Sequence, residues 1–133
     1  MNNPKLYLAI CLLIPMLALA TGKPKFSGFE VTSHEDPQLK FQFSAADASE
    51  KSPIVITAPG RELTKQDGGD RVDLQKYWLS VNVPKTYKLQ DRSLVTCPKI
   101  RDRDYFGACD EYVFLDPKAG KTISYFIYVG NWP

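Results

Sequence analysis

The residues best suited to chemistry or binding lie between Cys97 and Cys109, in the segment CPKIRDRDYFGAC. Arginine and aromatic side chains are the residue types that most often anchor protein–protein interfaces. The cations and aromatic residues of this segment are Lys99, Arg101, Arg103, Tyr105 and Phe106. Their types and close spacing predict a loop that binds another protein.

A disulfide between Cys97 and Cys109 is predicted to close this loop. Ordering a loop in advance lowers the entropy that binding costs, and the cross-link removes on the order of 3 kcal/mol of chain entropy from the unfolded state. The alternative is a purely structural disulfide that staples a hairpin. In that case the charged tip Arg101–Asp104 is solvated, and Tyr105 and Phe106 lie in the core. The sequence leaves both alternatives open.

The sequence predicts no catalytic residue, metal site or cofactor. A hydrolase triad needs a base, normally histidine, and the single histidine, His34, lies in a polar segment that resembles an exposed turn. The two mature cysteines lack the C-x-x-C spacing of redox and zinc sites. Asp67, Asp70 and Asp73 lack the D-x-D-x-D-G order of a calcium loop. We therefore expect a protein that is not an enzyme.

The first residues have the pattern of an export signal. Lys5 precedes the apolar stretch Leu6–Leu17, and Ala18–Ala20 supplies small residues for signal peptidase. The apolar stretch contains Pro15 and is shorter than the ~20 residues that span a bilayer. Residues 1–20 are therefore predicted to be a cleaved signal peptide, with retention as an anchor as the alternative. We expect the periplasm as destination and release from the cell as second choice.

Cleavage leaves residues 21–133, a length typical of one domain. Removing Lys5 from a formal net charge of +2 leaves +1, which is too close to neutral to favour nucleic acid or an anionic membrane as partner. Cleavage also removes Cys11, so that the mature chain keeps an even pair of cysteines in an oxidising compartment. That pair favours one disulfide.

Strand patterns dominate the mature chain. β-branched and aromatic runs, several with apolar residues at alternate positions, are typical of half-buried strands. The predicted strands are Phe26–Val31, Leu39–Phe43, Ile54–Ala58, Tyr77–Val83, Tyr87–Leu89, Ser93–Cys97, Glu111–Leu115 and Lys121–Val129. The last two form a hairpin, because Asp116-Pro117 starts a type I turn and Gly120 supplies a positive φ.

No window predicts a helix of more than a turn or two. Arg61–Asp73 is hydrophilic and is expected to be a long loop that can include a helical turn at Arg61–Gln66. Many short strands separated by turn residues predict a mainly β domain. Its expected form is a small antiparallel β-sandwich or barrel, immunoglobulin-like in general build.

Three classes of function fit these features. We favour a small exported binding protein without catalysis, an inhibitor or immunity-type protein that neutralises a toxin or lytic enzyme. Immunity proteins against periplasm-acting toxins and inhibitors of lysozyme are similar in size and build, although no motif here links the chain to them. The second class is a structural or adhesive β subunit, which would use an exposed edge at Ile123–Val129. The third is a small secreted hydrolase. The sequence predicts neither the partner's identity nor the oligomeric state.

Overall fold

The fold is mainly β, with one α-helix. The computed structural model describes residues 24–33 and 35–133, so that the predicted signal peptide and His34 lie outside the described residues. In chain order the elements are β1 (Phe29–Thr32), β2 (Lys40–Phe43), β3 (Ile56–Thr57), the 3₁₀ helix η1 (Lys65–Asp70), the α-helix α2 (Arg71–Asn82), β4 (Lys88–Thr96), β5 (Ala108–Asp116) and β6 (Lys121–Tyr128). No helix within the described residues has the length and apolar character needed to cross a membrane.

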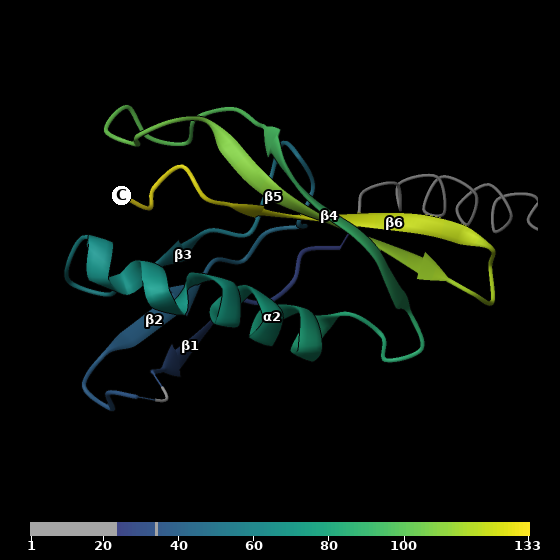
Figure 1. Cartoon of the computed structure of the whole chain (residues 1–133), viewed down its shortest axis with the longest axis horizontal. Coiled ribbons are helices and arrows are strands. Elements are labelled where there is room, and N and C mark those ends of the chain that lie inside the picture. Colours follow the sequence, from purple (N-terminus) through teal and green to yellow (C-terminus); the bar gives the residue numbers. More distant parts are fainter. Residues whose placement is uncertain (1–23, 34) are drawn as a thin grey trace, which may run out of the picture.

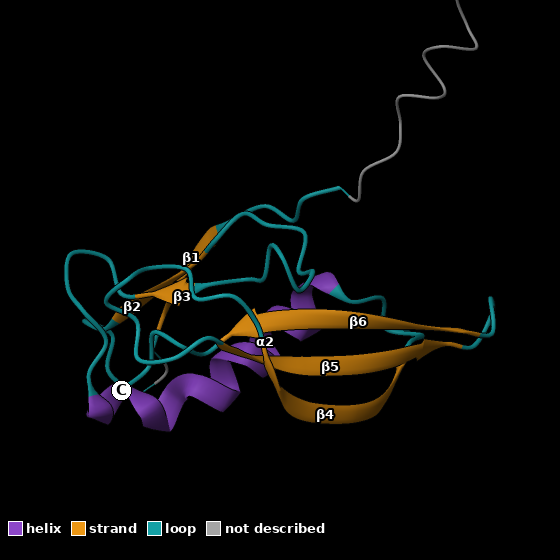
Figure 2. Ribbon diagram, turned by 90° about the horizontal axis from the view of Figure 1, so that it is seen from above, coloured by secondary structure: helices purple, strands orange, loops and turns teal. Residues whose placement is uncertain are grey.

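The strands form two antiparallel three-stranded sheets, ordered β1-β2-β3 and β4-β5-β6. Figure 2 shows the long strands β4, β5 and β6 side by side, with the short strands grouped toward the other end of the molecule. The mainly β prediction is confirmed. The barrel alternative is wrong, because neither sheet closes on itself within the part of the chain that the structure describes.

Strand β2 confirms the alternation predicted for Leu39–Phe43. Phe41 and Phe43 are fully buried, and Leu39 packs against the same core. On the neighbouring strand, Val31 and Phe29 lie opposite Phe41 and Phe43. These pairs bury one face of the smaller sheet, as period-two patterning requires.

The predicted hairpin of Glu111–Leu115 and Lys121–Val129 is confirmed as β5 and β6. Gly120 has a φ of +67°, the left-handed conformation that favours glycine. Asp116 Oδ1 accepts hydrogen bonds from the backbone N–H groups of Lys118 at 3.0 Å and Ala119 at 3.3 Å. Asp116 therefore stabilises the turn, as predicted from its position before Pro117.

The two short strands predicted at Tyr87–Leu89 and Ser93–Cys97 are one strand, β4, of nine residues. The pairing with β5 shifts register between Leu89 and Asp91, which marks a β-bulge. A bulge inserts one extra residue and breaks the regular alternation of faces. The polar residues Gln90, Asp91 and Arg92 interrupt the hydrophobic pattern at this point, between the two predicted strands.

The strand predicted at Tyr77–Val83 is wrong, and the loop predicted at Arg61–Asp73 is wrong from Lys65 onward. All of the expected strand Tyr77–Val83 except Val83 belongs to α2, a helix of 12 residues, and η1 occupies part of the expected loop. The buried residues of α2 are Leu74, Gln75, Trp78 and Leu79. Their spacing is that of one helical face, whereas Val81, expected on the buried side of a strand, is 54% exposed. A polar residue, Gln75, lies within the buried set and hides the apolar repeat.

Helix α2 contacts both sheets (Figure 1). Trp78 is fully buried, with its ring edge-on to Phe26 at a centroid distance of 5.0 Å and to Tyr125 of β6 at 6.1 Å. The Tyr77 ring lies 6.2 Å from Phe29 of β1. Such aromatic pairs add about 0.5–1.5 kcal/mol each to the stabilisation from buried area. The helix thereby joins the two sheets into one core.

An ion pair fixes the chain where it enters η1. Arg61 donates two hydrogen bonds to Asp67, Nη1 to Oδ2 at 2.8 Å and Nη2 to Oδ1 at 3.0 Å. The Thr64 N–H donates to Oδ2 at 2.6 Å, and Asp67 is buried. The hydrogen bond from Arg61 holds the pKa of Asp67 below its ordinary range, against the opposing effect of burial.

We predict that Asp67→Asn lowers the free energy of unfolding at neutral pH by about 2 kcal/mol, because Arg61 and Thr64 lose a charged acceptor. Folding lowers the pKa of Asp67, so its contribution is fully present above the unfolded pKa of about 3.9. The contribution is lost as the pH falls through the lower folded value. Urea unfolding from neutral to strongly acidic pH measures both effects.

Asp91→Asn, which removes an exposed carboxylate from β4, is the control. Its effect on stability should stay within about 0.5 kcal/mol. If the free energy of unfolding falls equally steeply with decreasing pH in the wild type and in Asp67→Asn, the ion pair does not have the stabilising role proposed for it.

Candidate functional site

The predicted disulfide between Cys97 and Cys109 is confirmed. Cys97 directly follows β4 and Cys109 lies in β5, so that the bond closes the connection between these strands, residues 98–107, which we call the closed loop. Both cysteines are buried and pack against the Tyr128 ring. The disulfide therefore lies in the protein interior and fixes both ends of the loop to the sheet.

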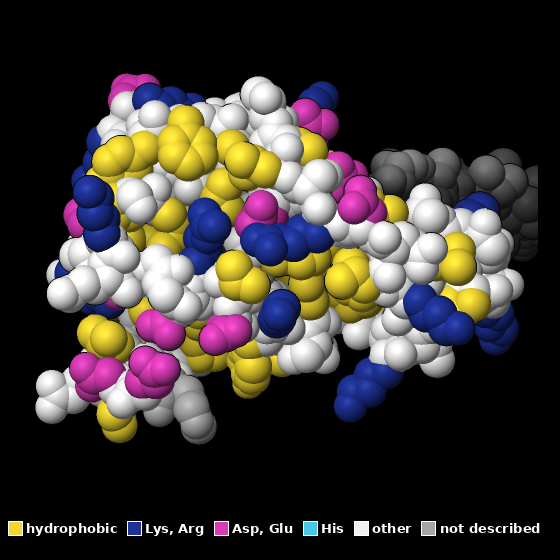
Figure 3. All heavy atoms as spheres, in the orientation of Figure 1, with side chains coloured by type: hydrophobic (Ala, Val, Ile, Leu, Met, Phe, Trp, Pro, Cys, Tyr) yellow, Lys and Arg dark blue, Asp and Glu magenta, His cyan; other side chains and the backbone are white. Residues whose placement is uncertain are grey.

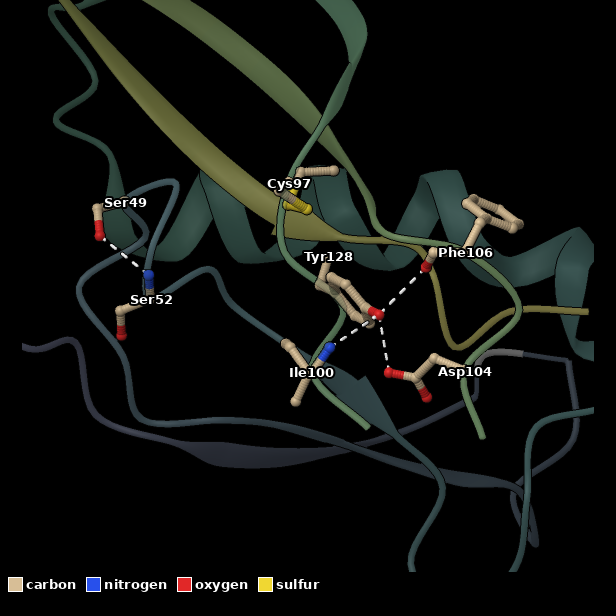
Figure 4. The surroundings of a disulfide bond; sticks show 8 residues. Ser49, Ser52, Cys97, Ile100, Asp104, Phe106 and Tyr128 are labelled. Carbon is tan, nitrogen blue, oxygen red and sulfur yellow. Dashed lines mark hydrogen bonds between the residues drawn. A yellow bond between two sulfur atoms is a disulfide. The ribbon is translucent and has the colours of Figure 1, made fainter. Parts of the chain in front are cut away.

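The hydroxyl group of Tyr128 contacts three residues of the closed loop. It donates a hydrogen bond to Asp104 Oδ2 at 2.7 Å and accepts one from the Ile100 N–H at 3.2 Å. The carbonyl oxygen of Phe106 lies 3.2 Å from the same hydroxyl. Figure 4 shows these three groups converging on the hydroxyl, with the Phe106 ring directed away from them. One buried side chain of β6 thus holds three points of the loop.

Asp104 is the second internal anchor of the closed loop. It is buried, and its carboxylate accepts hydrogen bonds from the backbone N–H and the Nε of Arg101, each at 2.9 Å. Burial alone would raise the pKa of Asp104, but the hydrogen bonds from Tyr128 and Arg101 lower it on balance. Burial raises the pKa of the Tyr128 hydroxyl, and the neighbouring Asp104 adds to that rise. The pair is therefore a neutral tyrosine donating to an ionised aspartate.

Two glycines allow the loop to approach the rest of the chain. A Cβ at Gly107 would lie 2.4 Å from the Cys97 carbonyl oxygen, and a Cβ at Gly130 would lie 1.9 Å from that of Phe106. The Tyr105 N–H also donates to the Gly130 carbonyl oxygen at 2.8 Å. Only glycine leaves room for this backbone contact between the loop and the C-terminal segment.

The outer side of the closed loop is apolar and open to solvent. Tyr105 is 61% exposed, Phe106 45% and Ile100 47%, and Leu94 of β4 is 67% exposed. Figure 3 shows hydrophobic side chains gathered at the upper left, where Figure 1 places the loop. The alternative that puts Tyr105 and Phe106 in the core therefore disagrees with the structure.

The three predicted cations differ in their surroundings. Arg101 Nε lies 2.9 Å from the internal Asp104, and its Nη2 lies 3.6 Å from Glu62 at the surface. Arg103 is exposed and lies 3.0 Å from the same Glu62. Lys99 Nζ donates to the Asp102 carbonyl oxygen at 3.2 Å. Arg101 therefore has a structural role inside the loop, and Lys99 and Arg103 are the cations at its surface.

Sequence reasoning missed Tyr128, Asp104 and Leu94. The alternative of a purely structural disulfide places Asp104 in a solvated tip, yet Asp104 is buried. The alternation along β6 places Tyr128 on one face of the strand, but the loop that covers its hydroxyl is 22 to 28 residues away in sequence. Local pattern carries no signal for such a contact.

Comparison with known proteins finds no matching family model, no matching curated protein and no matching solved structure.

Within residues 24–33 and 35–133, no group of three or more His, Cys, Asp or Glu side chains is arranged to bind a metal ion. Asp67, which the sequence placed in a rejected calcium loop, is instead bound to Arg61.

We predict that Tyr128→Phe lowers the free energy of unfolding by about 1–3 kcal/mol, because the buried Asp104 carboxylate and the part-buried Ile100 N–H lose their hydroxyl partner. Amide hydrogen exchange should rise first at Ile100 and Arg101, whose N–H groups belong to this network. Denaturant unfolding and exchange followed by mass spectrometry are the measurements.

Tyr105→Phe removes the hydroxyl of an exposed tyrosine from the same loop and is the matched control. We expect its stability and exchange pattern to equal those of the wild type. If Tyr128→Phe behaves like Tyr105→Phe, the hydroxyl does not hold the loop.

Proposed function

We propose that the protein is an exported, non-catalytic binding protein that inhibits a protein partner through the closed loop. The observation that carries this proposal is the combination of a rigidly held backbone with apolar side chains left in solvent. Tyr105, Phe106 and Leu94 form this apolar group, and Arg103 is an exposed cation of the same loop. A toxin or lytic enzyme acting outside the cytoplasm is the partner class that we propose.

The energetics of binding favour such a loop. Side chains that are ordered only on association cost about 0.5–1.5 kcal/mol each, and the Tyr128 hydroxyl, Asp104 and the disulfide order this backbone in advance. Tyrosine and arginine are enriched among the residues that dominate interface energies. The loop therefore supplies suitable contact residues at a low entropic cost.

A structural or adhesive subunit is supported less well. That function would use a free edge along Ile123–Val129, but the Phe126 N–H donates to the Ala48 carbonyl oxygen and the Tyr128 N–H to that of Ile54, each at 2.8 Å. The segment around Ala48–Ile54 therefore covers this part of the β6 edge. Trp132, near the C-terminus, is buried in the chain's own core. No group of the described residues favours the hydrolase alternative.

The proposed scaffold keeps an immunoglobulin-like sandwich as its predicted general build, although α2 is an addition to that build. We also propose that residues 1–20 direct export to the periplasm, where the disulfide forms and persists.

The export proposal predicts a mature protein that begins at Thr21. Intact-mass analysis of the protein recovered from the periplasm of cells expressing the full chain should show loss of residues 1–20 and of two hydrogens for the disulfide. A cytoplasmic protein of full mass, or an uncleaved membrane-bound form, would contradict the proposal.

The binding proposal predicts that Tyr105→Ala and Arg103→Ala weaken capture of the partner. The purified protein serves as bait for periplasmic extract and for the product of the adjacent gene, and the stoichiometry and affinity of the complex are then measured. A central aromatic contact is worth about 2 kcal/mol or more, so Tyr105→Ala should reduce affinity about 30-fold.

Leu89→Ala and Lys118→Ala are the matched controls, because they remove an exposed apolar side chain from β4 and a cation from the β5–β6 turn. Both should keep wild-type affinity. An affinity that is unchanged in Tyr105→Ala and Arg103→Ala would refute the closed loop as the binding site, and self-association alone would favour the structural subunit.

A further inference from the structure

A groove lies beside the closed loop, between α2 and β4. It has a volume of about 330 Å³, and its wall combines charged and apolar residues, among them Arg71, Arg92, Leu94, Phe106 and Asp110. On the face that Figure 3 shows, basic and acidic side chains adjoin the hydrophobic ones in the middle of the molecule. Phe106 belongs to both the loop and the groove, so the two surfaces are continuous.

The register of β4 explains why the groove is open. Arg92 lies opposite Tyr112 of β5 and Leu94 lies opposite Asp110, so these side chains share the face on which α2 packs. Tyr112 is buried beneath α2 and donates to Gln75 Oε1 at 2.5 Å. Leu94 is 67% exposed. Helix α2 therefore shields this face of the sheet from solvent at β5 but not at β4.

The charges in the groove are unbalanced. Arg92 Nη2 lies 3.2 Å from Asp110 Oδ2, the Arg92 side chain is 39% exposed, and its Cζ lies 5.6 Å from the centre of the Tyr112 ring. Arg71 forms no ion pair within the described part of the chain. Burial raises the pKa of Tyr112, and the positive charges of Arg92 and, more weakly, of Arg71 oppose this rise. Both arginines are therefore close enough to Tyr112 to act on its hydroxyl. Two cations and one carboxylate leave a net positive charge.

We propose that this groove binds a glutamate or aspartate side chain of the partner protein, with an apolar neighbour of that residue packed on Leu94 and Phe106. The inference rests on the proposed function, because it extends the same binding surface. Guanidinium groups bind carboxylates through paired N–H donors. An acidic residue flanked by apolar ones therefore matches the groove in both charge and surface.

A peptide probe tests the groove without the partner. The purified protein, labelled with ¹⁵N, is titrated by NMR with acetyl-Ala-Leu-Glu-Leu-amide and with the matched peptide that has glutamine in place of glutamate. We expect saturable shifts at Arg71, Arg92, Leu94 and Phe106, and about threefold to fivefold tighter binding of the glutamate peptide at low salt. This preference should decrease at high salt. Acetate alone should bind more weakly than the glutamate peptide.

Arg71→Gln and Lys76→Gln are the matched pair of variants, since each removes one cation from α2 and only Arg71 lines the groove. Arg71→Gln should abolish the preference for glutamate, while Lys76→Gln should keep it. Equal binding of the two peptides, shifts outside the groove, acetate binding as tight as the peptide, or equal behaviour of the two variants would each overturn the proposal.

The two proposals can fail separately. If Tyr105→Ala weakens the partner complex while Arg71→Gln leaves its affinity unchanged, the closed loop is the binding site and the groove proposal is wrong. If Arg71→Gln weakens the complex about threefold or more and Tyr105→Ala does not, the partner binds at the groove and Tyr105 of the closed loop takes no part.

Discussion

The buried hydroxyl of Tyr128 is the contact on which the proposed binding surface depends. Its bond to Asp104 makes an ionised carboxylate tolerable in the interior, and Asp104 in turn fixes both the backbone and the side chain of Arg101. With the disulfide closing the ends of the loop, these groups satisfy its inner polar atoms. Tyr105 and Phe106 take no part in this network, and both side chains are exposed to solvent.

The same constraint separates cations that look equivalent in the sequence. Arg101 and Arg103 are two residues apart and both lie within ion-pair distance of Glu62, but only Arg101 also pairs with the buried Asp104. An ion pair with a buried partner is costly to break, whereas an exposed pair contributes little to stability. Recognition can therefore use Arg103 without disturbing the fold.

Helix α2 determines which face of the larger sheet is available. By joining both sheets through Trp78 and Tyr77 it completes the core, but it covers β5 and β6 and leaves the inner face of β4 open. That geometry creates a groove whose residues come from the start of the helix, an edge strand and the closed loop. None of these segments forms such a surface by itself.

The sequence by itself determined the mainly β character, the β5–β6 hairpin and the disulfide, because alternation, turn residues and an even cysteine pair act over short distances. It failed at α2, where Gln75 interrupts the apolar face, and at β4, where a bulge interrupts the alternation. Only the tertiary structure decided that Asp104 is buried and that Tyr105 and Phe106 are exposed. Those outcomes depend on a tyrosine more than twenty residues away, and the free energy of such a long-range contact leaves no periodic pattern in the chain.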